Sequence, residues 1–266
     1  MEVTSLEIFG YIGALFIGLV LGLIGGGGSI LTVPILVYFM GLSPVIATAY
    51  SLFVVGSASL VGTVRNLPKK LVDFKTAFLF AVPAFSAVYV SRRFLIQAIP
   101  EVIISIGSLE LSKSMAIMLF FALLMLLASF SMIKNRAEQL SKSTGSKHTY
   151  WLILIGVIVG FLTGMVGAGG GFLIIPALVL FAKIPMKKAV ATSLLIIAIN
   201  SLIGFIGDVQ NIEINWYFLL VFTAISVIGI FIGVKLNHWI DGKKLRKGFG
   251  WFVLIMAIYI ILKELT

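Results

Sequence analysis

The sequence contains no cysteine, only two histidines and few charged residues, and each shortage excludes a class of protein. Without cysteine, the chain has no disulfides, no thiolate metal ligands and no thiol chemistry. His148 lies in a polar stretch and His238 beside a basic one, which indicates ordinary solvated positions for both. The chain also lacks an HExxH motif and paired carboxylates within its apolar segments, so we expect no enzyme, no metal site and no cofactor.

Charged residues make up only 11% of the chain, whereas hydrophobic residues make up 60% and the mean hydropathy is +1.16. A soluble domain of this length could not bury so much apolar surface. Several apolar runs have the roughly 20 residues that cross a bilayer core about 30 Å thick. The composition therefore predicts an all-α polytopic membrane protein, with the lipid bilayer as its first partner.

One apolar segment occurs twice, and a run of glycines interrupts both copies at the same place. Residues 22–62 and 164–204 align without a gap, so each residue of the first copy matches the residue 142 positions later. The matched pairs include Gly25 with Gly167, Gly27 with Gly169, Gly28 with Gly170, Pro34 with Pro176, Phe39 with Phe181, Ala47 with Ala189, Ser51 with Ser193, and Gly62 with Gly204. Such duplicated, glycine-interrupted segments are typical of transporters built from inverted repeats, which bind substrate where the breaks meet.

Apolar runs are predicted in two series of five, separated by a polar linker. They lie at about 6–24, 28–41, 44–66, 74–97 and 113–133, and again at about 150–167, 171–183, 187–206, 214–237 and 246–264. We therefore expect a first transmembrane repeat at 1–133, a cytoplasmic linker at 134–149 and a second repeat at 150–266. The runs 28–41 and 171–183 are too short to span upright. Each is expected to form one arm of a glycine-broken helical hairpin, with three further transmembrane helices per repeat.

Basic residues gather in four places, and they predict the orientation of the chain. The clusters are Arg65, Lys69, Lys70 and Lys75; Lys134, Arg136, Lys142 and Lys147; Lys183, Lys187 and Lys188; and Lys243, Lys244, Arg246 and Lys247. Basic loops prefer the cytoplasm, and all four clusters reach it if both broken segments are hairpins and the N-terminus is outside. The second repeat then enters from the opposite side, so the two repeats have inverted topology. This topology accounts for the net charge of +10, and we expect no nucleic acid partner.

Three features fall outside this simple pattern. Arg92 and Arg93 would face outside, near Glu101 and Glu110. The stretch 97–112 is only mildly apolar and is expected to be a surface helix or loop without a counterpart in the second half. The N-terminus has neither a basic segment nor a small-residue cleavage site, so we expect no cleaved leader.

The glycine breaks are candidate anion sites. A helix beginning just after Gly28 or Gly170 directs its unpaired N–H groups and its positive dipole end at the break. Glycine also lets the backbone approach a ligand closely, and the Ser29 hydroxyl adds a donor in the first copy. No lysine or arginine lies at the apolar middle of a run, so backbone dipoles are expected to supply the positive potential.

Together with polar side chains downstream of each break, these glycines give a predicted substrate-binding set. The set is Gly25, Gly27, Gly28, Ser29, Tyr50, Ser51, Gly167, Gly169, Gly170, Gly171, Thr192, Ser193 and Asn200. Asn200 is the strongest single ligand candidate, because an amide deep in an apolar helix needs partners. Interhelical or back-bonded hydrogen bonds are the alternative role of the hydroxyls. Pro34 and Pro176 are expected to shape the short helices.

Other glycines are interpreted differently. Those spaced along the longer apolar runs are typical of close helix packing, because small residues let two backbones approach. These are Gly13, Gly18, Gly156, Gly160, Gly229 and Gly233. Consecutive glycines each destabilise a helix by about 1 kcal/mol relative to alanine, so a packing seam does not explain four in a row.

The tandem pattern GLIGGGGSILTVPIL with ATAYSL, and GMVGAGGGFLIIPAL with AVATSL, resembles the TauE/SafE (TSUP) family of sulfite and organosulfonate exporters. The resemblance covers nearly the whole chain. It implies a multi-pass carrier of the prokaryotic inner membrane, with about eight helices, that moves small sulfur-containing anions outward. Related thiosulfate uptake proteins rely on cysteines, which this chain lacks.

The hypothesis from the sequence is therefore alternating access around a midplane anion site. An anion channel, or a carrier of another small anion such as a carboxylate, remains the alternative. Asp73 and Asp208, near helix ends, are weak candidates for proton or sodium coupling. The sequence leaves open whether the protein is a monomer or a homodimer.

Overall fold

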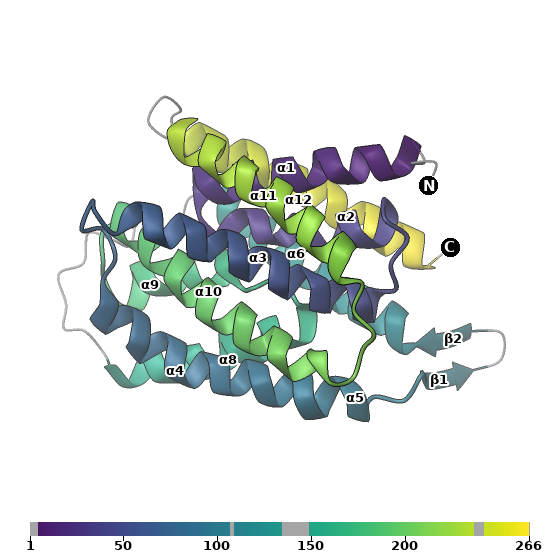
Figure 1. Ribbon diagram of the computed structural model, residues 1–266. Coiled ribbons are helices and arrows are strands. Elements are labelled where there is room, and N and C mark those ends of the chain that lie inside the picture. The colour runs from purple at the N-terminus through teal and green to yellow at the C-terminus, as the bar shows by residue number, and fades with distance from the viewer. Residues whose placement is uncertain (1–4, 107–108, 135–148, 237–241, 266) are drawn as a thin grey trace.

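The computed structural model describes residues 5–106, 109–134, 149–236 and 242–265, which form a helix bundle with one small β-hairpin (Figure 1). The elements in chain order are α1 (Ser5–Ile24), η1 (Gly26–Leu31), α2 (Thr32–Tyr38), α3 (Pro44–Asn66), α4 (Phe74–Val90), η2 (Ser91–Leu95), α5 (Ile96–Ala98), β1 (Val102–Ile106), β2 (Leu109–Ser112), α6 (Lys113–Ile133), α8 (Thr149–Val166), α9 (Gly171–Phe181), α10 (Met186–Val209), α11 (Trp216–Leu236) and α12 (Gly242–Leu265). The predicted apolar runs match these bounds to within a few residues.

Six of the described helical segments are long and apolar enough to cross a membrane. They are 44–66, 74–98, 113–133, 186–209, 216–236 and 247–265. Large apolar side chains are exposed on the surface of the bundle, among them Phe9, Phe78, Leu127 and Ile255. Numerous exposed apolar side chains of this kind are typical of contact with lipid. The predicted class, an all-α polytopic membrane protein, is confirmed.

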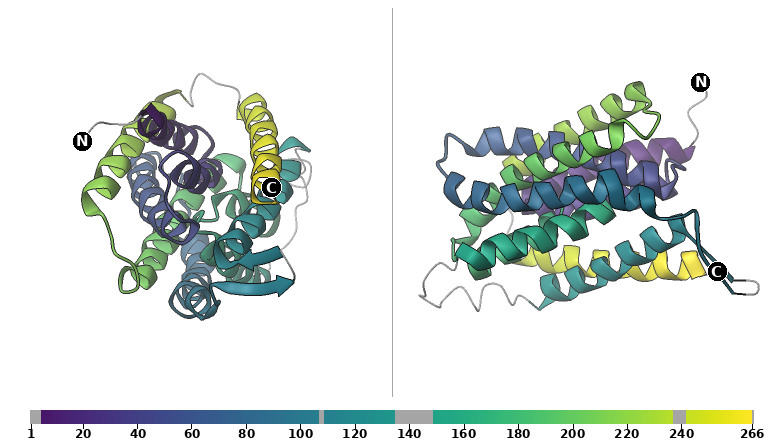
Figure 2. Two further views of the ribbon diagram at one scale, coloured as in Figure 1. Left: turned by 90° about the vertical axis from the view of Figure 1, so that its right-hand side faces the viewer. Right: turned by 90° about the horizontal axis from the view of Figure 1, so that it is seen from below.

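The two short arms turn back toward the end of the bundle from which they came. In Figure 1, α1 enters from the right and α2 returns to the right, whereas α8 enters from the left and α9 returns to the left. Both termini, the β-hairpin and the start of α3 lie at the right-hand end. The α3–α4 connection and the start of α10 lie at the left-hand end, and the views in Figure 2 agree. The two hairpins therefore point in opposite directions.

The stretch 97–112, expected as a surface helix or loop, forms mainly the antiparallel strands β1 and β2 instead. Their register pairs Val102 with Ser112 and Ile106 with Leu109. The helix ends at Ala98 because Pro100 disfavours helical backbone at Ile99, which has ψ 121°. The β-branched run from Val102 to Ile104 then favours extended backbone. The Lys113 N–H donates to the Glu101 carbonyl at 2.9 Å and ties the hairpin to the start of α6.

The long helices pack mainly across the two halves of the sequence. Helix α1 lies against α11, α4 against α8, α6 against α12, and α3 against α10. The predicted division into repeats at 1–133 and 150–266 stays a prediction, and most of the linker 134–149 lies outside the described residues, with Arg136, Lys142 and Lys147. Since each helix of the first half has a partner from the second, the two halves are interleaved in space.

Glycines let several of these helices approach each other closely. A Cβ atom on Gly18 would overlap the Ser226 carbonyl of α11, and one on Gly229 would overlap the Leu15 carbonyl of α1. Gly160 lies against the Ala84 carbonyl in the same way, and Gly156 against that of Phe80. The predicted packing role is confirmed for these glycines and for Gly233, which packs on Leu19.

Candidate functional site

Helices α1 and α8 end at matched glycines that both have a positive φ. Gly25 has φ 79° and Gly167 has φ 73°, values that glycine adopts without strain. Each N–H donates at 2.8 Å to a carbonyl four residues earlier, Leu21 in the first copy and Thr163 in the second. The repeat is therefore visible in the hydrogen bonds that end the two helices.

Beyond these residues the two breaks differ. In the first copy the chain continues at once into the 3-10 helix η1, and the α-helix begins only at Thr32, so the prediction of a helix starting just after Gly28 is wrong. The Ser29 hydroxyl donates to the Gly26 carbonyl at 2.8 Å and is therefore used within the turn. In the second copy, Gly169 and Gly170 are also left-handed, with φ 63° and 71°.

Helix α9 begins at Gly171, just after Gly170, as predicted. Its eleven residues present a regular N-terminus at the second break, whereas the first break leads into two shorter helices. The second break is therefore the one at which the positive, N-terminal end of a regular α-helix lies.

The two breaks meet at the centre of the bundle. Gly26 and Gly171 contact each other so closely that a Cβ atom on either would overlap the backbone of the other. Gly28 lies against the backbone of α1, with its Cβ position 2.5 Å from the Leu21 nitrogen. The surroundings of Gly27 lie outside what the structure describes. The glycines are therefore needed for close approach between the hairpins as well as for turning the chain.

Arg92 lies at the second break, and this corrects a prediction. It was expected to face outside, yet its side chain is 0% exposed. It lies near the end of the apolar run 74–97, not at the middle of a run, where no lysine or arginine was expected. The π-helical turn η2 follows α4 directly and carries Arg92 inward. The Arg92 guanidinium reaches Gly167, whose Cβ position would overlap Nη2. A fixed positive charge therefore stands beside the second break.

Two side chains hold the Arg92 guanidinium. Nη1 donates to the Thr48 hydroxyl of α3 at 3.1 Å and lies 3.4 Å from Oδ2 of Asp208 in the last turn of α10. Asp208 is 5% exposed. The position matched to Thr48 in the second copy is Val190, which packs against Gly25 as Thr48 packs against Gly167. A hydroxyl and a guanidinium group therefore lie beside Gly167 of the second break, whereas an apolar side chain lies beside Gly25 of the first.

Several buried polar atoms, including two of Arg92 itself, have no hydrogen-bond partner in the described part of the chain. They are Arg92 Nε and Nη2, Asp208 Oδ2, both amide atoms of Asn200, and the hydroxyls of Ser201, Ser51, Ser59 and Thr32. The Ser201 hydroxyl is 2.8 Å from the Cβ position of Gly169, so it faces the second break. Each unsatisfied buried group costs about 1–3 kcal/mol, and a bound anion is one partner that would satisfy the donors among them.

Ser201 and Asp208 lie seven residues apart on α10, which places them on one face at a separation of about 10 Å along the helix. We refer to Arg92, Ser201, and the glycines Gly167, Gly169, Gly170 and Gly171 as the second-break site. Arg92 and Ser201 are absent from the predicted set. One feature of the sequence could have identified Arg92 as a site residue. The pair Arg92 and Arg93 lies in a span that has no other charged residue after Lys75.

Two predicted ligands instead hold connections in place. The Tyr50 hydroxyl accepts from the Asn215 N–H at 2.6 Å, and the matched Thr192 hydroxyl accepts from the Asp73 N–H at 3.0 Å. Asp73 and Asn215 then cap α4 and α11, through bonds to the N–H groups of Thr76 and Phe218. Tyr50 and Thr192 are therefore equivalent anchors for the start of a helix.

The remaining predicted residues divide in the same way. The Ser193 hydroxyl donates to the Val190 carbonyl at 2.8 Å, which is the back-bonded alternative, whereas the Ser51 hydroxyl is buried and unpartnered. Pro34 lies in the first turn of α2, and Pro176 lies inside α9. Within the described residues, no group of histidine, aspartate and glutamate side chains has the arrangement of a metal site.

Comparison with known proteins gives a consistent result over most of the chain. The family model described as "Sulfite exporter TauE/SafE" matches residues 11–260. The "Probable membrane transporter protein YunE" of Bacillus subtilis is 31% identical, with 93% of this chain and 92% of the relative covered. A "Probable membrane transporter protein" of Xylella fastidiosa strain Temecula1 is 29% identical over 92% and 91%, and one of Methanocaldococcus jannaschii, MJ0441, is 28% identical over 93% and 94%. No solved structure matches significantly.

Proposed function

Since the chain belongs to the TauE/SafE family of membrane transporters, we propose that it exports a small sulfur-containing anion, such as sulfite or a sulfonate, by alternating access. The single observation that carries this proposal is the buried Arg92 guanidinium beside Gly167. A charged side chain at membrane depth is expensive, and such residues mark substrate pathways.

The chemistry of the second-break site suits a sulfur oxyanion. A guanidinium presents five N–H donors in a planar fork that matches the oxygens of sulfite or a sulfonate. Arg92 uses Nη1 for Thr48 and Asp208, which leaves Nε and Nη2 as a pair of donors on one edge. The N-terminus of α9 and the Ser201 hydroxyl add further donors from the other side of the break.

Asp208 gives the site a means of release. Its carboxylate neutralises Arg92 at 3.4 Å, but the contact lacks the geometry of a hydrogen bond. Removing the partner of a buried ion leaves an uncompensated charge, which is strongly unfavourable. An incoming anion therefore competes with the carboxylate for Arg92, and the ion pair between Arg92 and Asp208 is restored when the anion leaves.

The packing suggests which parts move. Buried side chains form two separate clusters, one built mainly by α1, α2, α3, α6, α11 and α12, and the other by α4, α8, α9 and α10. The contact between Gly26 and Gly171 joins η1 of the first group to α9 of the second. We infer that these two groups rock against each other, rather than the two halves of the sequence.

Orientation follows from charge. The ends of α3 and α11 and the starts of α4 and α10 lie at one end of the bundle and carry basic residues, among them Arg65, Lys75, Lys187 and Lys235. We assign this end to the cytoplasm of a prokaryotic cell, which places both termini outside.

The proposal is tested by uptake of radiolabelled sulfite into proteoliposomes, followed by a panel of sulfonates and carboxylates, with and without a proton or sodium gradient. Saturable flux with counterflow supports a carrier, whereas flux that never saturates indicates a channel. Carboxylate flux without sulfite or sulfonate flux would show that the substrate is a carboxylate and not a sulfur-containing anion.

Arg92 has a matched control in its neighbour. Arg93 is only half-buried, and its Nη1 donates to Asn211 at 3.3 Å. The single variant Arg92→Gln would leave the buried Asp208 carboxylate without its counter-charge. The test variant is therefore Arg92→Gln/Asp208→Asn, which replaces the ion pair by a neutral pair of similar size. We expect this variant to lose at least about 30-fold in transport, as for a buried charged contact worth about 2 kcal/mol or more, with Arg93→Gln unchanged. Normal saturable flux in a well-folded double variant contradicts the proposal.

A further inference from the structure

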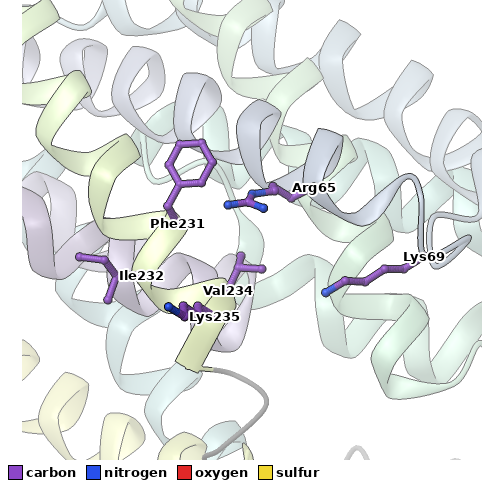
Figure 3. Close-up of a pocket in the computed structure, with 6 residues that line it drawn as sticks. All are labelled: Arg65, Lys69, Phe231, Ile232, Val234 and Lys235. Atoms are coloured by element: carbon purple, nitrogen blue, oxygen red, sulfur yellow. The ribbon is translucent and has the colours of Figure 1, made fainter.

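A second positively charged site lies on the surface of the bundle, where α3 and α11 end side by side. A cavity of about 430 Å³ is lined by Arg65 and Lys69 from the end of α3 and the turn after it, and by four residues of α11 (Figure 3). These four are Phe231, Ile232, Val234 and Lys235. We call this cavity the cationic groove. It combines three basic side chains with an apolar wall.

The cationic groove is distinct from the second-break site. Arg65 is 17 residues beyond Thr48 on the same helix, which corresponds to roughly 25 Å along its axis. Arg65 and Lys235 are exposed, whereas Arg92 is fully buried. The groove and the proposed transport site therefore do not share residues.

Two of the three basic side chains of the groove, Arg65 and Lys235, have no carboxylate partner among the described residues. The Arg65 guanidinium lies 4.7 Å from the centre of the Phe231 ring, a cation–π contact that fixes its position. Neither α3 nor α11 contains an aspartate or glutamate. Among the described residues, no ion pair involves Arg65 or Lys235. Their charges are thus available to an external anion.

Exposed apolar side chains continue from the groove toward the middle of the membrane. Leu60 and Val64 lie one turn apart on α3 and are 45% and 56% exposed, and Ile228 and Ile232 lie one turn apart on α11 and are 55% and 38% exposed. Both pairs are on the surface that faces lipid. A ligand that fills the groove and follows these side chains needs an anionic head joined to an apolar tail.

We propose that the cationic groove binds the headgroup phosphate of an anionic phospholipid, such as phosphatidylglycerol, from the cytoplasmic leaflet. The phosphate accepts hydrogen bonds from Arg65 and Lys235, and the acyl chains lie along the apolar surfaces of α3 and α11. Such a lipid bridges two helices from opposite halves of the sequence, because it contacts the ends of both.

The test is lipid retention measured by native mass spectrometry of the full protein in detergent with equal amounts of phosphatidylglycerol and phosphatidylcholine. The variant Arg65→Gln/Lys235→Gln removes two charges from the groove. Each basic residue near the surface contributes about fivefold in affinity, so we expect about 25-fold weaker phosphatidylglycerol binding and unchanged phosphatidylcholine binding. The control Lys187→Gln/Lys188→Gln removes two exposed charges at the same end of the bundle and should bind both lipids like the wild type.

Two further measurements separate the outcomes. Arg65→Lys keeps the charge, so it should stay within about threefold of the wild type, whereas a larger loss would indicate a structural role of the Phe231 contact instead. Inorganic phosphate is titrated at constant ionic strength; displacement of the lipid at low millimolar phosphate would assign the groove to a free anion. Equal lipid retention by the groove and control variants would overturn the proposal.

Discussion

Gly26 and Gly171 lie back to back at the centre of the bundle, each occupying the space that a Cβ atom of the other would need. They belong to different halves of the chain and are not matched positions of the repeat. The contact brings the first break, a 3-10 turn, against the first residue of α9.

Alanine at either position of this contact should damage the protein. Gly26→Ala and Gly171→Ala introduce a methyl group where backbone already lies, and overpacking of this kind costs about 1–3 kcal/mol. We expect lower thermal stability and reduced flux in both variants. Gly248→Ala, on α12 with no atom within 4 Å of its Cβ position, is the control and should be neutral or slightly stabilising. Unchanged stability in Gly171→Ala would show that the two breaks do not touch.

Asp208→Asn should separate binding from release. Without the competing carboxylate, Arg92 holds the transported anion more tightly, so KM and the maximal rate should both fall. Steady-state flux against substrate concentration measures both. A raised KM with an unchanged maximal rate would show that Asp208 helps to bind the substrate rather than to displace it.

Thr48→Val makes the first copy resemble the second, where Val190 is the matched residue. The variant removes the hydrogen bond to Arg92 Nη1, and a bond to a charged group contributes about 1.5–3 kcal/mol. We expect KM to rise by roughly tenfold or more, because the guanidinium is less well oriented. Thr223→Val removes a hydroxyl bonded only within α11 and should leave KM unchanged. A similar rise of KM in both variants would show that the hydrogen bond between Arg92 and Thr48 is not what orients the guanidinium.

Tyr50→Phe tests whether a predicted ligand is instead an anchor. The variant leaves the Asn215 N–H without its acceptor, so we expect a loss of about 1 kcal/mol in stability and no change in KM. Thermal unfolding and flux are compared on the same preparation, and Thr192→Val, the matched position, should behave alike. A changed KM at unchanged stability would restore both residues to the substrate site.

The bounds of the helices and the position of both breaks were predictable because they depend on local sequence. The run of glycines at Gly25 to Gly28 cannot continue an α-helix, and long apolar runs determine the spans. Arg92 was missed because its burial depends on Asp208, which lies more than 100 residues away, and on a π-helical turn. Charge patterns assign whole loops to a side of the membrane but do not show which way one side chain points.

The predicted ligands Tyr50 and Thr192 show a related limit. Their match between the two copies was visible in the sequence, but their partners, Asn215 and Asp73, are backbone N–H groups of distant loops. Polarity inside an apolar helix indicates that a side chain needs a partner. It does not indicate whether that partner is a ligand or the protein itself.

The pairing of α1 with α11 determines when the fold can be completed during synthesis. Helix α1 ends at Ile24, and α11 begins at Trp216, so the ribosome adds about 190 residues between them. At 5–20 residues per second, this takes on the order of 10–40 s. During that interval, the face of α1 that carries Gly18 and Gly22 lies in the bilayer without α11 packed against it.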